Sequence, residues 1–287
     1  MKNIIITGGY GQLGIACKKD LKNSFNTLIT GSNTFREGVK LDITNRNDIA
    51  RVYSDFKPDV VLNLAAMTNV DECDRDKIGA NKINIEGVEN LCENFKGHFI
   101  QLSTDYVFDG LSGPYNELDE VNPISHYGKT KLEAENWLKN NYSNSTILRA
   151  NVLYSYNKRT KANFVKWVVD SLKNNKEINV VNDQWNNPTW TESIAVVINN
   201  IVDIGLTGLY HYGDKDFMSR YDFAQLITKV FNLDRSLISP INTSSLNQTA
   251  KRPLKSGLKT EKIESELGIV PNSVENCLRK IRNNLSK

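Results

Sequence analysis

A short apolar run that leads into a glycine-spaced turn constrains the fold of this chain more than any other feature. Residues 3–7 (NIIIT) have the pattern of a buried β-strand, and Gly8, Gly11 and Gly14 follow at intervals of three. A helical pattern then runs from 15 to about 21. This order of elements is the framework that binds a dinucleotide pyrophosphate at a helix N-terminus. An ordinary tight turn between a strand and a helix is the alternative.

Further apolar runs alternate with helical patterns through the first half of the chain. They occupy residues 27–30, 60–64, 98–103 and 146–149. This alternation predicts a parallel sheet with crossover helices, and the loops at the carboxyl ends of its strands are expected to carry the ligand site. We therefore predict an α/β fold with a Rossmann-like, doubly wound parallel sheet.

Tyr127 and Lys131 stand four residues apart in a helical pattern and therefore share one face of the helix. A cation near a phenol lowers its pKa from about 10, so we expect Lys131 to lower the pKa of Tyr127. Thr104 ends an apolar run, and its hydroxyl can bind the same substrate oxygen. Any helix can carry a Tyr-x-x-x-Lys pair on a solvated face. The pair therefore indicates a hydride-transfer site only in combination with the glycine turn.

Together these motifs resemble the extended short-chain dehydrogenase/reductases, and within them the dTDP-4-dehydrorhamnose reductases. The resemblance is carried by the glycine turn, Asn-Leu-Ala-Ala at 63–66, Ser-Thr-Asp-Tyr-Val-Phe-Asp-Gly at 103–110, Tyr-Gly-Lys-Thr-Lys at 127–131, Val-Asn-Asp-Gln at 181–184, Pro-Thr at 188–189, Gly-Leu-Tyr-His at 208–211 and Lys-Arg-Pro-Leu at 251–254. It therefore covers nearly the whole chain, and the run at 103–110 is its most specific part.

Cofactor binding is expected along the ends of the first strands. The candidates are Gly8, Gly11, Gln12, Leu13, Gly14, Ser32, Arg36, Asp42, Ile43, Asn63, Ala65, Ala66, Tyr127 and Lys131. After the run at 27–30 no acid occurs before Glu37, while Arg36 can bind a 2′-phosphate, so we predict NADPH and leave NADH open. The resemblance implies that Asp42 and Ile43 contact the adenine.

The resemblance also implies the substrate and the reaction. It makes Thr104, Tyr127 and Lys131 catalytic, and the substrate-binding candidates are Thr104, Asp105, Tyr106, Asn163, Phe164 and Arg252. The expected reaction is reduction of the 4-keto group of a nucleotide-linked 6-deoxysugar, with Tyr127 as the proton donor. Related dehydratases carry Asp-Glu after the catalytic Thr, whereas Tyr106 follows Asp105 here, which disfavours dehydration.

Two other functions remain open at this stage. A sugar-nucleotide epimerase would use the same Tyr and Lys, and the non-catalytic regulatory subunit of methionine adenosyltransferase resembles the same family. Val152 stands where the rhamnose-pathway reductases usually have a Trp, so the sugar itself is not fixed by the sequence. The sequence also leaves open the nucleotide base and the stereochemistry of the product.

We predict two interleaved lobes. Residues 1–154 and about 191–213 would form the dinucleotide-binding lobe, and about 155–190 and 214–287 a smaller α/β lobe for the sugar nucleotide. Helices are expected around 163–173, 192–204 and 220–231 and near the C-terminus, and 208–212 resembles a strand that returns to the sheet.

Composition excludes several other classes of protein. A net charge of +3 with interspersed charges indicates no nucleic-acid partner, and the sequence shows no membrane segment or leader. The four cysteines and three histidines lack metal-ligand spacing, so we predict no metal site, reduced thiols and a cytoplasmic location. Some relatives dimerise through acidic residues and Mg²⁺. Glu192 matches one such position but Ala16 replaces another, so a homodimer stays open.

Overall fold

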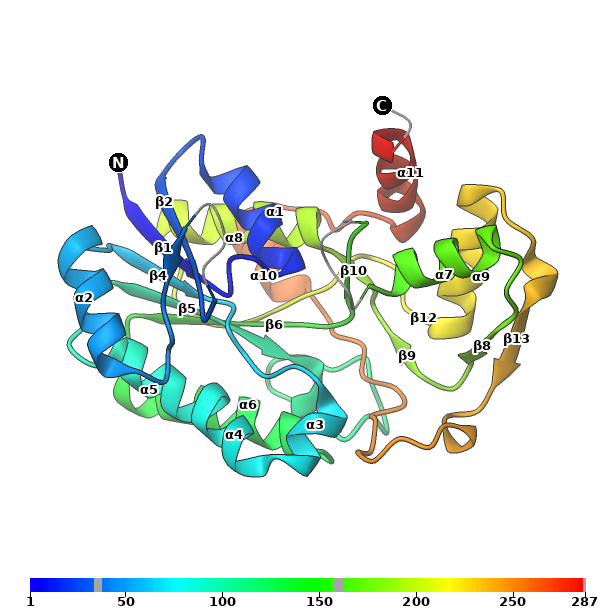
Figure 1. Cartoon of the computed structure of the whole chain (residues 1–287), viewed down its shortest axis with the longest axis horizontal. Coiled ribbons are helices and arrows are strands. Elements are labelled where there is room, and N and C mark those ends of the chain that lie inside the picture. The colour runs from blue at the N-terminus through cyan, green and yellow to red at the C-terminus, as the bar shows by residue number, and fades with distance from the viewer. Residues whose placement is uncertain (34–37, 157–162, 286–287) are drawn as a thin grey trace.

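The computed structural model describes residues 1–33, 38–156 and 163–285. Within them, seven strands form one parallel sheet, and the order of the strands reverses at β1 as in a doubly wound fold (Figure 1). In spatial order the strands are β11 (Gly208–Tyr212), β6 (Ser145–Ala150), β5 (His98–Thr104), β4 (Val60–Asn63), β1 (Asn3–Thr7), β2 (Asn26–Gly31) and β3 (Val39–Lys40). The predicted fold class is confirmed.

Helices cover both faces of this sheet, which explains why its strands read as unbroken apolar runs. One face packs against α1 (Gln12–Leu21), α8 (Thr191–Ile204) and α10 (Glu261–Leu267); the other packs against α2 (Arg46–Phe56), α5 (Gly87–Cys92) and α6 (His126–Asn141). In β1, Ile4 and Ile6 enter the first core and Ile5 enters the second. Beside α6 lie α3 (Val70–Arg75), α4 (Lys77–Asn81) and a π-helical segment, Lys82–Glu86.

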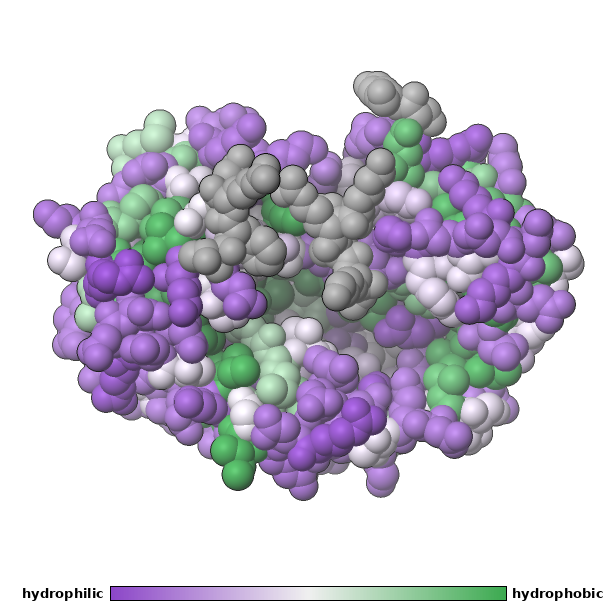
Figure 2. Space-filling view, viewed as in Figure 1, coloured by the Kyte–Doolittle hydropathy of each residue, from purple (hydrophilic) through white to green (hydrophobic). Residues whose placement is uncertain are grey.

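A second lobe has a separate core beyond the carboxyl ends of the strands. Its helices are α7 (Phe164–Lys173), α9 (Arg220–Phe231) and α11 (Val274–Leu285), and its short strand pairs are β8 (Ile178–Val181) with β13 (Ile238–Ile241), β9 (Trp185–Asn186) with β12 (Met218–Ser219), and β7 (Leu153–Tyr154) with β10 (Thr189–Trp190). Single 3₁₀ turns occupy Arg235–Leu237 and Thr243–Ser245 in this part of the chain, and another, Asp105–Val107, follows β5 of the sheet. Between the two lobes the surface is hollowed (Figure 2).

The division of the chain between the lobes remains a prediction, and α10 shows where it needs refinement. This helix falls inside the range 214–287 assigned to the sugar lobe, yet it buries Ile263 in the core of the sheet. No helix in the described part of the chain combines the length and apolarity that crossing a membrane requires.

Candidate active site

A cleft of about 560 Å³ opens at the carboxyl ends of β1, β2 and β4, where the strand order reverses. Ten of the residues predicted to bind the cofactor line it: Gly8, Gly11, Gln12, Leu13, Gly14, Ser32, Asp42, Ile43, Ala65 and Ala66. Its size and position fit the elongated dinucleotide that the glycine turn predicts.

The glycine turn brings the backbone of β1 against that of β4. Gly8 has a φ of +60°, and a Cβ at this position would lie 2.8 Å from the carbonyl carbon of Leu64. The turn closes with a hydrogen bond from the N–H of Gly11 to the oxygen of Gly8 (3.0 Å), and α1 begins at Gln12 without a side-chain cap. The first N–H groups of α1 therefore remain available to an anion in the cleft.

Among the other cofactor candidates, Asn63 is not part of the cleft wall. Asn63 is buried, accepts a hydrogen bond from Thr7 (2.5 Å) and donates one to Gln101 (2.8 Å), so it ties three strand ends together. Asp42 both lines the cleft and accepts hydrogen bonds from the backbone N–H and hydroxyl of Thr44. Arg36 lies outside the described residues.

The sequence analysis missed several residues of the cleft wall. They are Tyr10, Gly31, Asn33, Leu41, Thr44, Leu64, Thr68, Ile83, Leu102 and Leu153. Most are neighbours of predicted residues and could have been included by extending each strand end by one or two positions. Ile83 and Leu153 carried no local signal, because they reach the cleft from distant segments.

The start of α6 sets the position of Tyr127. Ser125 caps the helix by accepting a hydrogen bond from the N–H of Gly128 (3.2 Å). A Cβ on Gly128 would lie 2.1 Å from the backbone oxygen of Tyr106, so only glycine permits this close contact between helix and loop. The ring of Tyr106 meets that of Tyr127 edge-on, with centroids 5.6 Å apart.

Thr104 and Tyr127 meet at the end of β5. Burial raises the pKa of the Tyr127 phenol, and the neighbouring Thr104 hydroxyl lowers it by a smaller amount. The phenol therefore stays protonated at neutral pH, as a proton donor requires. The expectation that Lys131 lowers the pKa of Tyr127 is wrong for this structure, because desolvation is the dominant influence.

Lys131 lies one helical turn beyond Tyr127 and is buried. Its Nζ donates to the backbone oxygen of Leu102 at 2.7 Å, and Leu102 lines the cofactor cleft. Burial lowers the pKa of Lys131 to about 8, and the negative charge of Glu135 opposes that shift. The ammonium therefore lies at the inner edge of the cleft, close to its own titration range.

This pKa predicts an alkaline limit to activity. As pH rises through about 8, Lys131 loses its proton and kcat/KM for NADPH is expected to fall, while Tyr127, with its raised pKa, still holds its proton. Steady-state rates measured against pH would show the fall. Lys131→Arg keeps the charge at all these pH values, so its profile should lose this limb even if its maximum rate is lower. An identical limb in both proteins would assign it to another group.

Asp105 lies directly beyond Thr104 and is buried. It accepts hydrogen bonds from the hydroxyls of Thr104 (3.1 Å) and Ser256. Burial raises the pKa of Asp105 to about 6, although these hydrogen bonds lower it. The hydrogen bond from Ser256 joins the end of β5 to a segment near the C-terminus.

The three other substrate candidates have partners inside the protein. Asn163 caps α7 and donates to Ser155 (3.1 Å), which in turn donates to Gln12 (3.2 Å), so it lies near the glycine turn. The ring of Phe164 stacks on that of Phe223 in the second core. Arg252 lies at the interface between the lobes, where it is paired with an acidic residue of α3.

A buried ion pair supports the catalytic helix from behind. Glu135 follows Lys131 by one turn on α6, and both of its oxygens accept hydrogen bonds from Arg149 of β6, at 2.9 and 2.6 Å. Ser103 of β5 donates to the same carboxylate (2.5 Å), and His211 of β11 contacts the guanidinium (3.2 Å). This network holds α6 against three strands, and no local sequence pattern indicates it.

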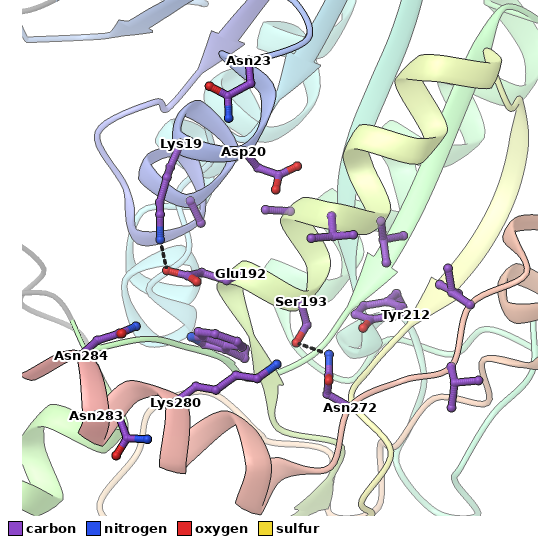
Figure 3. Close-up of a pocket in the computed structure, with 17 residues that line it drawn as sticks. Lys19, Asp20, Asn23, Glu192, Ser193, Tyr212, Asn272, Lys280, Asn283 and Asn284 are labelled. Atoms are coloured by element: carbon purple, nitrogen blue, oxygen red, sulfur yellow. Dashed lines mark hydrogen bonds and ion pairs between the residues drawn. The ribbon is translucent and has the colours of Figure 1, made fainter.

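A larger cavity, of about 850 Å³, lies away from these residues, between α1, α8 and α11 (Figure 3). Ala16 and Glu192, the two positions considered for a metal-linked dimer, both line it, and Glu192 forms an ion pair with Lys19 (3.0 Å). In residues 1–33, 38–156 and 163–285, no three His, Cys, Asp or Glu side chains are grouped as metal ligands. Thr104, Tyr127 and Lys131 line neither this cavity nor the cleft. Lys131, however, donates a hydrogen bond to Leu102 of the cleft wall, so the predicted catalytic residues lie beside the cleft.

Comparison with known families agrees with this geometry. The family model described as RmlD substrate binding domain matches residues 1–286. The chain belongs to this RmlD family. The RmlD-family relative named dTDP-4-dehydrorhamnose reductase, from Aggregatibacter actinomycetemcomitans, is 34% identical over 98% of this chain and 99% of its own length.

Two further comparisons bear on cofactor and function. The crystal structure of the Bacillus anthracis dTDP-4-dehydrorhamnose reductase in complex with NADP has a TM-score of 0.91 and 28% identity, and covers 99% of each chain. Methionine adenosyltransferase 2 subunit beta from Danio rerio is 29% identical over 92% of this chain and 84% of its own length. Chains that are similar to this one therefore carry different names, and the site must distinguish among their functions.

Proposed function

We propose that this protein is an NADPH-dependent reductase of the 4-keto group of a nucleotide-linked 6-deoxysugar, with the activity of a dTDP-4-dehydrorhamnose reductase. The observation that carries the proposal is the convergence of Thr104, Tyr127 and Lys131 at the end of β5, beside the cleft at the glycine turn. The full-length match to the family and its reductases supports the same activity.

The fit of a dinucleotide rests on the cleft itself. The close approach of Gly8 to β4 leaves a backbone cradle without side chains, and the N–H groups at the start of α1 suit a pyrophosphate. We place the nicotinamide end toward Leu102 and Lys131, whose ammonium would hold the ribose. NADPH supplies the hydride when bound.

The residues of this chain would act on the ketone oxygen. Thr104 would orient the carbonyl through its hydroxyl. Tyr127, protonated because of its raised pKa, would give its proton to the oxygen as negative charge develops there. Tyr106 and Asp105 would form the wall beside the sugar. The resulting alcohol leaves Tyr127 as a buried phenolate, which must regain a proton before the next turnover.

A panel of substrates tests the function. The protein should oxidise NADPH with a dTDP-linked 4-keto-6-deoxysugar and form one alcohol per NADPH consumed. An epimerase would change the sugar without net consumption of cofactor. A regulatory subunit would bind NADPH, leave every ketosugar in a dTDP-, GDP-, UDP- and CDP-linked panel unreduced, and alter the activity of a partner enzyme.

Cofactor preference has its own test at Arg36. Only NADPH carries a 2′-phosphate, so Arg36→Ala should raise the KM for NADPH by several-fold, corresponding to about 1 kcal/mol, and leave the KM for NADH almost unchanged. Initial rates with each cofactor measure both values. Equal changes for the two cofactors would remove Arg36 from the phosphate site.

Two further expectations concern the location of the protein in the cell and its oligomeric state. We place the protein in the cytoplasm, a placement supported by its four buried, unpaired cysteines, Cys17, Cys73, Cys92 and Cys277. A homodimer is proposed only as an alternative to a monomer, and light scattering of the purified protein would decide between them.

A further inference from the structure

Arg220 is a partly buried cation whose outer nitrogens have no partner among the residues that the structure describes. It begins α9, which is fixed by a capping box between Ser219 and Asp222. Its Nε donates to the side chain of Gln184 (3.2 Å), and its guanidinium carbon lies 5.7 Å from the ring centre of Phe164. Within the described residues, its Nη groups form neither a hydrogen bond nor an ion pair. Four N–H donors on an oriented, planar cation are therefore available to a ligand.

Contacts connect Arg220 to the end of β5. Gln184, which accepts from its Nε, precedes Trp185, and the backbone oxygen of Trp185 accepts a hydrogen bond from the N–H of Ser256 (2.9 Å). The hydroxyl of Ser256 donates in turn to Asp105, and the charge of Arg220 acts on this region. It lowers the pKa values of Asp105 and Tyr106, although burial raises both by a larger amount. Its effect on the pKa of Tyr106 exceeds that of Arg252, so Arg220 is the more effective cation at this ring. Tyr106 in turn touches Tyr127 edge-on. Arg220 therefore acts on two residues, Asp105 and Tyr106, that adjoin Thr104 and Tyr127.

Arg252, the cation among the predicted substrate-binding residues, already has partners within the protein. Its Nη2 pairs with Asp71 of α3 at 3.0 Å, and its Nη1 donates to the backbone oxygen of Ala250 at 2.8 Å. Asp71 also accepts a hydrogen bond from the N–H of Ala250 (2.9 Å). Asp71 neutralises Arg252, and the pair connects α3 of the sheet lobe to the segment that contains residues 250–252. These contacts form an ion pair between the lobes rather than an anion-binding site.

The chemistry of the substrate decides between the two arginines. In a 4-ketosugar nucleotide, the ketone carbon and the carbon that bears the diphosphate lie at opposite ends of the sugar ring. With the ketone at Thr104 and Tyr127, a sugar that lies along Tyr106 would carry its diphosphate toward the second lobe, where Arg220 begins α9. We propose that Arg220 binds the diphosphate of the sugar nucleotide, an inference that rests on the proposed function, while Asp71 and Arg252 hold the lobes together.

Binding of dTDP, measured by calorimetry on the NADPH-loaded protein, tests this assignment. Arg220→Met should weaken dTDP binding by about 10- to 100-fold, the loss expected for hydrogen bonds to a charged group, and leave the weak binding of thymidine unchanged. Arg220→Lys keeps a charge without the planar fork and should lose affinity to an intermediate degree. Arg235→Met, which removes an exposed arginine of the same lobe, is the matched control.

The double variant Asp71→Asn, Arg252→Met removes the Asp71–Arg252 ion pair without leaving an uncompensated carboxylate. It should lower the Tm and change the Kd for dTDP less than Arg220→Met does. The inference is overturned if Arg220→Met and Arg220→Lys bind dTDP like the parent, or if the double variant loses more affinity than either. When either of these binding results is found but the parent protein still reduces the ketosugar, only the assignment of Arg220 fails and the proposed function stands. A parent that neither binds dTDP nor reduces any ketosugar contradicts both.

Discussion

Tyr127→Phe should reduce kcat by roughly 10²-fold or more, the contribution expected of a general acid. The substitution removes one hydroxyl and keeps the ring that meets Tyr106 edge-on. Because the proton is needed chiefly in the transition state, NADPH affinity and folding should change little. Steady-state rates with the ketosugar, together with fluorescence titration of NADPH, measure both quantities.

Tyr142→Phe is the matched control for this prediction. Tyr142 ends the same helix and donates a hydrogen bond to the backbone oxygen of Gly97 (2.8 Å), far along α6 from the cleft. Its loss should cost about 1 kcal/mol of stability and leave kcat at the parent value. If Tyr127→Phe also turns over at the parent rate, α6 does not carry the proton donor.

Arg149→Met should lower the free energy of unfolding by about 3–5 kcal/mol. Arg149 and Glu135 are both almost completely buried, so the substitution leaves a carboxylate in the core without its main partner. Urea unfolding followed by circular dichroism measures the loss. The effect should be among the largest for a single substitution outside the cleft.

Two further variants separate this buried pair from general damage to the core. Lys139→Met removes another cation 3.8 Å from Glu135, but its side chain is 42% exposed, so its loss should cost at most about 1 kcal/mol. Glu135→Gln combined with Arg149→Met removes both charges and should recover part of the lost stability. The loss of unfolding free energy in the double variant is compared with the sum of the losses in Glu135→Gln alone and Arg149→Met alone. A loss larger than this sum would show that charge pairing is not the cause.

Much of the fold could be predicted because its strands are buried on both faces. The runs at 27–30, 98–103 and 146–149 lie within β2, β5 and β6, and 220–231 coincides with α9. Boundaries were less certain where the apolar pattern starts late. The pattern of α1 begins at Ile15, but the helix begins at Gln12, because backbone hydrogen bonds of the glycine turn start it.

The cofactor cleft could be predicted from the sequence because its residues cluster at strand ends. The cation opposite the active site could not. Arg220 begins a helix of the other lobe, and only the folded chain brings its charge near Asp105 and Tyr106. Arg252 was predicted to bind the substrate because its sequence motif resembles that of the family, but its pairing with Asp71 joins residues 181 positions apart. Burial also reversed the expected direction of the Tyr127 pKa, because local spacing carries no information on desolvation.

Transfer of deuterium from NADPH that carries deuterium at both nicotinamide C4 positions tests the central claim most directly. With a dTDP-linked 4-keto-6-deoxysugar, the parent should place one deuterium on sugar C4 for each labelled NADPH oxidised, seen by mass spectrometry and by loss of the C4 proton signal. Tyr127→Phe should give the same labelled product at a rate lower by about 10²-fold. Turnover without deuterium at C4, or tight NADPH binding with no reduction of any ketosugar, would contradict the account.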